Sequence, residues 1–173
     1  EDILSLKLLT TAKETAFSFL PLAHALERTA GYYTLIAAAA TIYYAAGMEE
    51  IAADIRKVAP PVVVAIPRLF EKIRLSLMSR LTGIKRLIFG LALFIGKVYT
   101  ARRSTGKKAP LWQSLFRICD RLVYRQVKAE FGGRIKFFVS GGAPLTREIG
   151  RFFEALDLTI IEGYGLTESA PVI

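Results

Sequence analysis

Short apolar runs rich in β-branched and aromatic residues alternate along this chain with longer stretches in which apolar residues recur every three or four positions. The short runs are typical of strands, and the longer stretches are typical of helices. Strands that alternate with helices predict an α/β fold with a mostly parallel sheet flanked by helices. The predicted strands are Phe17–Leu20, Thr41–Ala45, Val62–Ile66, Ile135–Ser140 and Thr159–Glu162. The predicted helices are Leu22–Ala38, Met48–Val58, Arg68–Leu81, Ile84–Thr100, Leu111–Phe131 and Thr146–Leu156.

The net charge of +9, from 24 Lys and Arg against 15 Asp and Glu, would attract phosphates, anionic lipid or nucleic acid. The basic residues show no zinc-ligand spacing, no basic helix followed by heptads and no aromatic RNP-like strand, so nucleic acid is not an expected partner. The densest positive stretch, Arg102-Arg103 with Lys107-Lys108, follows an apolar helix. A solvated helix end explains it better than a membrane contact, which stays an alternative.

The length and composition suit one domain or part of one, since 173 residues with 53% hydrophobic and 23% charged residues lie close to ordinary globular usage. Cys119 is the single cysteine, which excludes an intrachain disulfide and a cysteine metal cluster and fits a reducing compartment. No secretion signal opens the chain, so we expect a cytoplasmic protein, with a peripheral membrane contact as an open alternative. Glu1 and the apolar end at Ile173 suggest a piece of a longer chain.

The first candidate site segment is the loop after the predicted strand Ile135–Ser140, where Gly141 and Gly142 precede Ala143 and Pro144. Two glycines at a strand end allow backbone to approach a ligand closely, and open parallel sheets bind ligands beyond the carboxyl ends of their strands. A nucleotide is therefore expected near this loop. An ordinary strand-to-helix connection has the same composition, so the loop alone does not decide the function.

The second candidate segment, residues 162–168, again follows an apolar strand. Two glycines flank Tyr164, whose ring can stack on a flat base. Thr167 offers a hydroxyl to a phosphate oxygen, and Glu168 offers a hard oxygen ligand to Mg²⁺. A tyrosine-containing turn with a solvated glutamate is an equally good explanation of these residues taken alone.

The third candidate segment carries the chain's single histidine, His24, after a strand and a proline turn. Histidine at such a junction can carry a proton or orient a substrate, although a lone histidine is more often a hydrogen-bonded structural residue. The spacing supplies no acid partner, so a Ser-His-Asp hydrolase is not supported.

Together these segments resemble the long-chain fatty-acid–CoA ligases of the adenylate-forming AMP-binding superfamily. The stretches that carry the resemblance, in the family's order, are SFLPLAHALER, IPRLFEKI, FFVSGGAPLTREIGRFFEAL and IIEGYGLTESAPVI. The resemblance runs from Ser18 to Ile173 and is most specific at Tyr164–Glu168, where the superfamily is recognised. It implies that residues 1–173 are an internal fragment of the large N-terminal AMP-binding (adenylation) domain.

The resemblance implies a ligase that uses ATP and Mg²⁺ to convert a fatty acid into acyl-AMP and then transfers the acyl group to coenzyme A. His24 would position the carboxylate, Thr167 would hold the α-phosphate, and Glu168 would hold the metal. Fatty acid, ATP and CoA are thus the expected small-molecule partners. A homodimer is a further possible assembly. The residues expected to line the nucleotide and acyl site are Gly141, Gly142, Ala143, Pro144, Glu162, Gly163, Tyr164, Gly165 and Thr167.

The chain also departs from the family pattern. The phosphate-binding loop ending in Pro-Lys-Gly, the later ribose-binding Asp and the small carboxy-terminal domain with its catalytic Lys have no counterpart in it, so the isolated chain is expected to be inactive. Two alternatives stay open: an adenylating enzyme for another carboxylate, and a non-catalytic remnant with a scaffold or membrane-associated role.

Two predicted helices have a marked apolar side. For both, core packing is the favoured interpretation. The alternative for the helix at Ile84–Thr100 is to shield an acyl tunnel or touch a membrane. The apolar side of that helix comprises Ile84, Leu87, Ile88, Leu91, Ile95 and Val98. The apolar side of Leu111–Phe131 comprises Trp112, Leu115, Phe116, Cys119, Leu122, Val123 and Val127.

Overall fold

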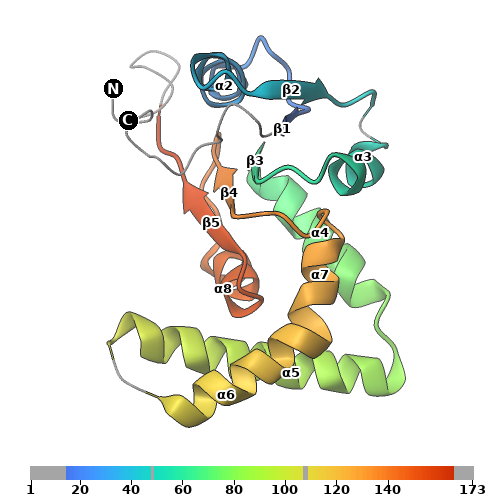
Figure 1. The fold of residues 1–173 in the computed structure, drawn as a ribbon, viewed down its shortest axis with the longest axis vertical. Coiled ribbons are helices and arrows are strands. Elements are labelled where there is room, and N and C mark those ends of the chain that lie inside the picture. Colours follow the sequence, from blue (N-terminus) through green and yellow to red (C-terminus); the bar gives the residue numbers. More distant parts are fainter. Residues whose placement is uncertain (1–14, 48, 107–108, 166–173) are drawn as a thin grey trace.

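The computed structural model describes residues 15–47, 49–106 and 109–165, which form a five-stranded sheet with helices around it (Figure 1). The strand order is β2-β1-β3-β4-β5, and all four strand pairs are parallel. The predicted α/β fold with a parallel sheet is therefore confirmed. The strands are β1 (Thr15–Ser18), β2 (Thr41–Tyr44), β3 (Val62–Ala65), β4 (Phe137–Ser140) and β5 (Thr159–Glu162).

Strand β3 is the centre of the sheet, and all four of its residues are buried. It pairs in register with β4 along its whole length, from Val62 opposite Phe137 to Ala65 opposite Ser140. The predicted strand ran one residue further, to Ile66. That residue has extended backbone and precedes Pro67, the first residue of the next helix, because a residue before proline avoids the helical region.

Helices connect the strands in the predicted order. The first begins later than predicted, because His24 donates its backbone N–H to Pro21 O at 2.8 Å and the segment from Leu22 to His24 forms a turn. Two segments have π-helical hydrogen bonding. The helices are η1 (Glu27–Tyr33), α2 (Thr34–Ala37), α3 (Ile51–Val58), α4 (Pro67–Ser79), α5 (Gly83–Ser104), α6 (Pro110–Cys119), η2 (Asp120–Tyr124), α7 (Arg125–Ala129) and α8 (Arg147–Ala155).

The connection between β3 and β4 contains α4, α5, α6, η2 and α7 in succession. Helices α5 and α6 form a layer of their own beyond α8, at the bottom of Figure 1, away from the sheet. Helix α5 packs closely on α8, because Gly96 leaves room for the backbone carbonyl of Ala155. A layer at this distance from the sheet has one side turned to α8 and one side left without a neighbour in the described structure.

The predicted core side of α5 was wrong. The residues that pack toward the core are Phe89, Ala92, Ile95 and Gly96, and of these only Ile95 belonged to the predicted stripe. The close approach at Gly96 determines which side of the helix faces α8. The side of α5 that has more large aliphatic residues is therefore exposed. The exposed aliphatic residues on that side are Ile84, Leu87, Ile88 and Leu91.

The predicted core side of the helix at Leu111–Phe131 was correct for Phe116 and Val127 but wrong for Leu122, which is exposed. The π-helical turn η2 lies between these parts and changes the phase of the helix surface. Tyr124, absent from the predicted side, is fully buried instead and donates its hydroxyl to Ala92 O of α5 at 2.8 Å.

Substitution of Gly96 by Ala should destabilise the fold severely. A Cβ at this position would lie 2.0 Å from the carbonyl oxygen of Ala155, so two backbones would have to separate. We expect a loss of about 1–3 kcal/mol or more in the free energy of unfolding, measured by urea denaturation. Gly90 of the same helix is the matched control, because its Cβ would meet nothing within 4 Å and Gly90→Ala should stabilise by up to ~1 kcal/mol. Equal urea midpoints for G96A and the unsubstituted protein would contradict the packing described.

Candidate functional site

The three predicted site segments follow strands of one parallel sheet, so they leave it at the same edge. His24 lies beyond β1, the loop from Gly141 lies beyond β4, and Gly163 lies directly after β5. The chain runs from β1 outward to β2 and then returns to place β3 on the other side of β1. The direction of the connections therefore changes between β1 and β3, and in such sheets ligands bind in the crevice beyond the carboxyl ends of the strands at this point.

The glycine loop is held against the strand ends by backbone contacts. Gly141 donates its N–H to Ala65 O of β3 at 3.1 Å, and a Cβ on Gly141 would lie 2.8 Å from a methyl carbon of Leu26. Gly142 has a φ of +81°, which favours glycine, and a Cβ there would lie 3.9 Å from the His24 ring and 3.8 Å from Ile66. The structure thus brings the predicted His24 and glycine-loop segments together next to the β1/β3 switch.

The segment after β5 joins the same edge. Gly163 donates its N–H to Ser140 O at 2.8 Å, and the Glu162 carboxylate accepts a hydrogen bond from the Leu145 N–H at 3.4 Å. Tyr164 is 70% exposed, so most of its ring surface is free for a ligand to stack on. The other predicted lining residues at this edge, Ala143, Pro144 and Gly165, are exposed or half-buried.

Glu27 is a site-region residue that the sequence interpretation missed. Its side chain is 1% exposed at the start of η1, and it accepts a hydrogen bond from the Ser18 hydroxyl at the end of β1 at 2.5 Å. Burial raises the pKa of Glu27 above its ordinary value, and the hydrogen bond from Ser18 partly offsets the rise. A glutamate spaced at helical intervals with buried Gly31, Thr34 and Leu35 was the signal that could have revealed it.

The Glu27 carboxyl fixes the His24-bearing segment to the sheet. Gly31 makes room for it, since a Cβ there would lie 2.5 Å from the carboxyl carbon. The second carboxylate oxygen of Glu27, Oε2, has no hydrogen-bond partner in the described residues. The same holds for the buried Ser140 hydroxyl at the end of β4. Buried polar atoms without partners are costly, so their presence near the ligand-binding edge of the sheet is consistent with a functional site.

Two predicted site residues, Thr167 and Glu168, lie outside the described residues. Within the described ranges, no group of three or more His, Cys, Asp or Glu side chains is placed to hold a metal ion. Among the helices of those same ranges, none is long and apolar enough to cross a membrane.

Comparison with known protein families identifies the family of this chain. The family model described as AMP-binding enzyme matches residues 3–173. The chain belongs to this family. Its sequence is 33% identical over 161 residues to the long-chain-fatty-acid–CoA ligase FadD15 of Mycobacterium bovis, which covers 91% of the chain and 26% of the relative. It is also 33% identical over 165 residues to long chain acyl-CoA synthetase 1 of Arabidopsis thaliana, covering 92% of the chain and 24% of the relative.

Solved structures confirm the fold. The A-PCP didomain of carboxylic acid reductase from Segniliparus rugosus, solved in complex with AMP, superposes with a TM-score of 0.57 at 21% identity over 92% of this chain and 19% of the other. The chain spans about a quarter of the length of the curated relatives it matches. The predicted membership in the adenylate-forming superfamily is confirmed. The fold also matches the N-terminal domain of FACL13 from Mycobacterium tuberculosis, with a TM-score of 0.56 at 14% identity over 96% of this chain and 30% of the other, so the parallel sheet corresponds to part of the large N-terminal domain of such enzymes.

Replacing Glu27 by Gln should change how stability depends on pH. A carboxyl whose pKa is raised in the folded state binds its proton more tightly there than in the unfolded state, so it favours folding below about pH 4.5 and loses this contribution as the pH rises toward the raised pKa. Glutamine does not titrate. The Tm of E27Q minus that of the unsubstituted protein should therefore increase as the pH is raised from 4.5 to 8, measured by thermal denaturation. A difference that stays constant with pH would contradict the buried, titrating carboxyl.

Proposed function

We propose that the protein containing this chain is an ATP-dependent ligase that activates a long-chain fatty acid as acyl-AMP and transfers it to coenzyme A. Residues 1–173 would be part of its AMP-binding domain. The observation that carries the proposal is the meeting of Gly142 with His24 at the β1/β3 switch, beside the Tyr164 segment. Relatives named as long-chain acyl-CoA synthetases, at 33% identity over most of the chain, support the fatty-acid substrate.

The exposed strand-end backbone fits an adenine nucleotide. Gly142 has no side chain to block a flat ring, and the exposed ring of Tyr164 offers a stacking surface. In this proposal Gly141, Gly142, Ala143 and Pro144 line the adenine and acyl side. Glu162, Gly163, Tyr164 and Gly165 enclose adenine on the β5 side.

Three further residues would serve the reacting groups. His24, exposed beside Gly142, would position the carboxylate that is activated, and Thr167 would hold the α-phosphate. Glu168 would bind Mg²⁺. A single carboxylate suits this ion, because Mg²⁺ is commonly held by one or two carboxylates, several waters and substrate phosphates.

The proposed reaction requires stabilisation of negative charge more than it requires a strong base. A fatty-acid carboxylate is already ionised when its oxygen attacks the α-phosphorus and pyrophosphate leaves, and the CoA thiol then displaces AMP. Negative charge accumulates on phosphate oxygens, and Mg²⁺ supplies charge stabilisation there when bound. The Thr167 hydroxyl would add a donor aimed at the same oxygens.

A second candidate substrate is another carboxylic acid, since the structural relative from Segniliparus rugosus is a carboxylic acid reductase. The acyl pocket distinguishes the two, because a long aliphatic chain needs a deep apolar pocket. A non-catalytic relative with the same fold is the third candidate, favoured if the whole protein lacks the family's catalytic Lys. A cytoplasmic location and a homodimer remain part of the proposal for the whole protein.

Loss of the Glu168 carboxylate should abolish Mg²⁺-dependent exchange of pyrophosphate into ATP driven by fatty acid. Without its protein ligand the metal would no longer be held at the phosphates, so Glu168→Ala should lower exchange by at least ~100-fold. Glu154→Ala, at an exposed position on α8, is the matched control and should retain full exchange. Exchange in E168A equal to that of the control would rule out the metal role.

Removal of the Tyr164 ring should weaken ATP binding. Stacking of a base on an aromatic ring contributes about 1–3 kcal/mol, so Tyr164→Ala should raise the Kd for ATP by about fivefold to a hundredfold or more, measured by titration calorimetry. Tyr164→Phe keeps the ring and should bind ATP like the unsubstituted protein. An unchanged Kd in Y164A would show that the adenine lies elsewhere.

A further inference from the structure

Helix α5 carries a row of large apolar side chains that face away from the rest of the described structure. We call Ile84, Leu87, Ile88, Leu91 and Phe94 the outer face of α5. Their spacing places them on one side of the helix, and each is exposed, with Leu87 at 73% and Leu91 at 60%. Scattered exposed apolar residues are ordinary, but a contiguous row over three turns of one helix marks a surface that meets another apolar phase.

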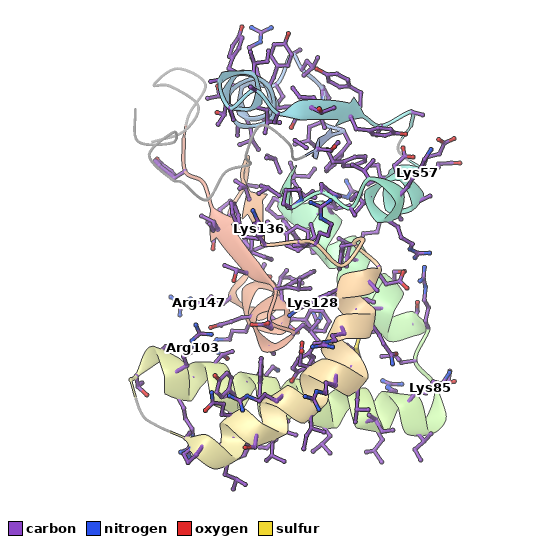
Figure 2. All side chains as sticks on the ribbon, in the orientation of Figure 1. Lys57, Lys85, Arg103, Lys128, Lys136 and Arg147 are labelled. Carbon is purple, nitrogen blue, oxygen red and sulfur yellow. The ribbon has the colours of Figure 1, made fainter. Side chains whose placement is uncertain are left out.

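The neighbouring helix extends this apolar surface. Leu111, Ile118 and Leu122 of α6 and η2 are also more than half exposed and recur at helical spacing. Both helices lie in the layer beyond α8 (Figure 1), and side chains project outward from them along the bottom of the molecule (Figure 2). The outer face also holds a shallow groove next to Gly83 and Gly90, where the missing side chains expose the flank of Leu87.

Residues 72–119, which include α5 and α6, carry only positive side-chain charges. No Asp or Glu occurs between Glu71 and Asp120, and the same stretch holds many of the chain's basic residues. Lys85 and Arg103 lie near the two ends of α5, as Figure 2 shows. Lys85, Arg86 and Lys97 are exposed and make no ion pair within the ranges that the structure describes. The basic residues of the stretch are Lys72, Arg74, Arg80, Lys85, Arg86, Lys97, Arg102, Arg103, Lys107, Lys108 and Arg117.

We propose that the outer face of α5, extended by α6, binds the surface of an anionic phospholipid bilayer, with α5 lying in the plane of that surface. Helices with an apolar face and bordering Lys or Arg bind in this way, because the apolar side chains enter the acyl boundary while the cations stay with the anionic headgroups. Neither nucleotide nor fatty acid is needed for this contact, so it goes beyond the proposed catalytic function.

The charge pattern favours lipid over a protein occupant. A second copy of the chain would bring the same uncompensated cations against each other in an isologous contact, and like charges across an interface are unfavourable. Another segment of the same protein would have to supply carboxylates to pair Arg86 and Lys97 beside the apolar row. An anionic bilayer supplies both the apolar phase and the negative charge.

The test is sedimentation of the full-length protein with lipid vesicles at low and physiological salt. Vesicles of phosphatidylcholine with 30% phosphatidylglycerol should carry the protein into the pellet, and vesicles of phosphatidylcholine alone should carry much less. Binding should weaken as salt rises, because the Debye length falls from about 30 Å at 0.01 M to about 8 Å at 0.15 M. The double variant Leu87→Gln/Leu91→Gln should lower the partition coefficient at least about tenfold.

Matched control variants distinguish vesicle binding through this surface from non-specific binding. Leu75→Gln, at an equally exposed leucine on α4, should bind vesicles like the unsubstituted protein. Lys85→Gln should weaken binding by about fivefold, since a basic residue near an anionic surface contributes about 1 kcal/mol. Lys57→Gln on α3, far from α5 in Figure 2, should leave binding unchanged.

Four results would overturn the proposal: no vesicle binding at low salt, equal binding by L87Q/L91Q, a lower Tm of L87Q/L91Q in lipid-free buffer, or a dimer that L87Q/L91Q converts to monomer. The third result would show that the outer face of α5 packs within the whole protein, and the fourth would show that it joins two copies.

Pyrophosphate exchange measured without vesicles on the same preparations separates the lipid-binding proposal from the ligase proposal. Absent exchange with intact vesicle binding would refute the ligase function and leave this inference standing.

Discussion

Phe138, 1% exposed in the middle of β4, is the side chain around which the core is assembled, and its ring contacts those of Phe70, Phe131 and Phe153 at centroid distances of 5.3–6.1 Å. The three contacts are near edge-to-face, the geometry that aromatic quadrupoles favour. They join the sheet to α4, to the turn after α7 and to α8. Since the glycine loop begins three residues after Phe138, the position of the candidate site depends on this packing.

The other half of the site depends on a buried polar contact. The hydrogen bond between Ser18 and Glu27 ties the start of η1 to the end of β1, and His24 lies on the turn between them. Burial of a carboxyl costs free energy, which its raised pKa reflects. Apolar side chains of similar volume often stabilise a buried position as well as a polar pair does. Under the proposed function, the hydrogen bond between Ser18 and Glu27 would specify one orientation of the segment that carries His24.

The long connection between β3 and β4 gives the chain its second kind of surface. Its helices are too many to lie on the sheet, so α5 and α6 stack beyond α8. The carboxyl edge of the sheet then presents glycine backbone and polar groups, whereas the outer layer presents aliphatic side chains and cations. These two surfaces differ in chemistry, so the function proposed for one does not depend on the contact proposed for the other.

The sequence alone determined the alternation of strands and helices, their approximate bounds and the three loops of the candidate site. Such information is local: a short β-branched run such as Val62–Ala65 is typical of a buried strand, and glycines after a strand allow a close backbone approach. Glu162 as the partner of the Leu145 N–H, Gly142 beside His24 and the burial of Glu27 were decided by tertiary structure, because strands far apart in the chain had first to pair. The same is true of α5, whose inner side includes Gly96 at its close approach to Ala155, whereas the side with more large aliphatic residues is exposed. Periodicity identifies an apolar side, but only the neighbouring element determines which side is covered.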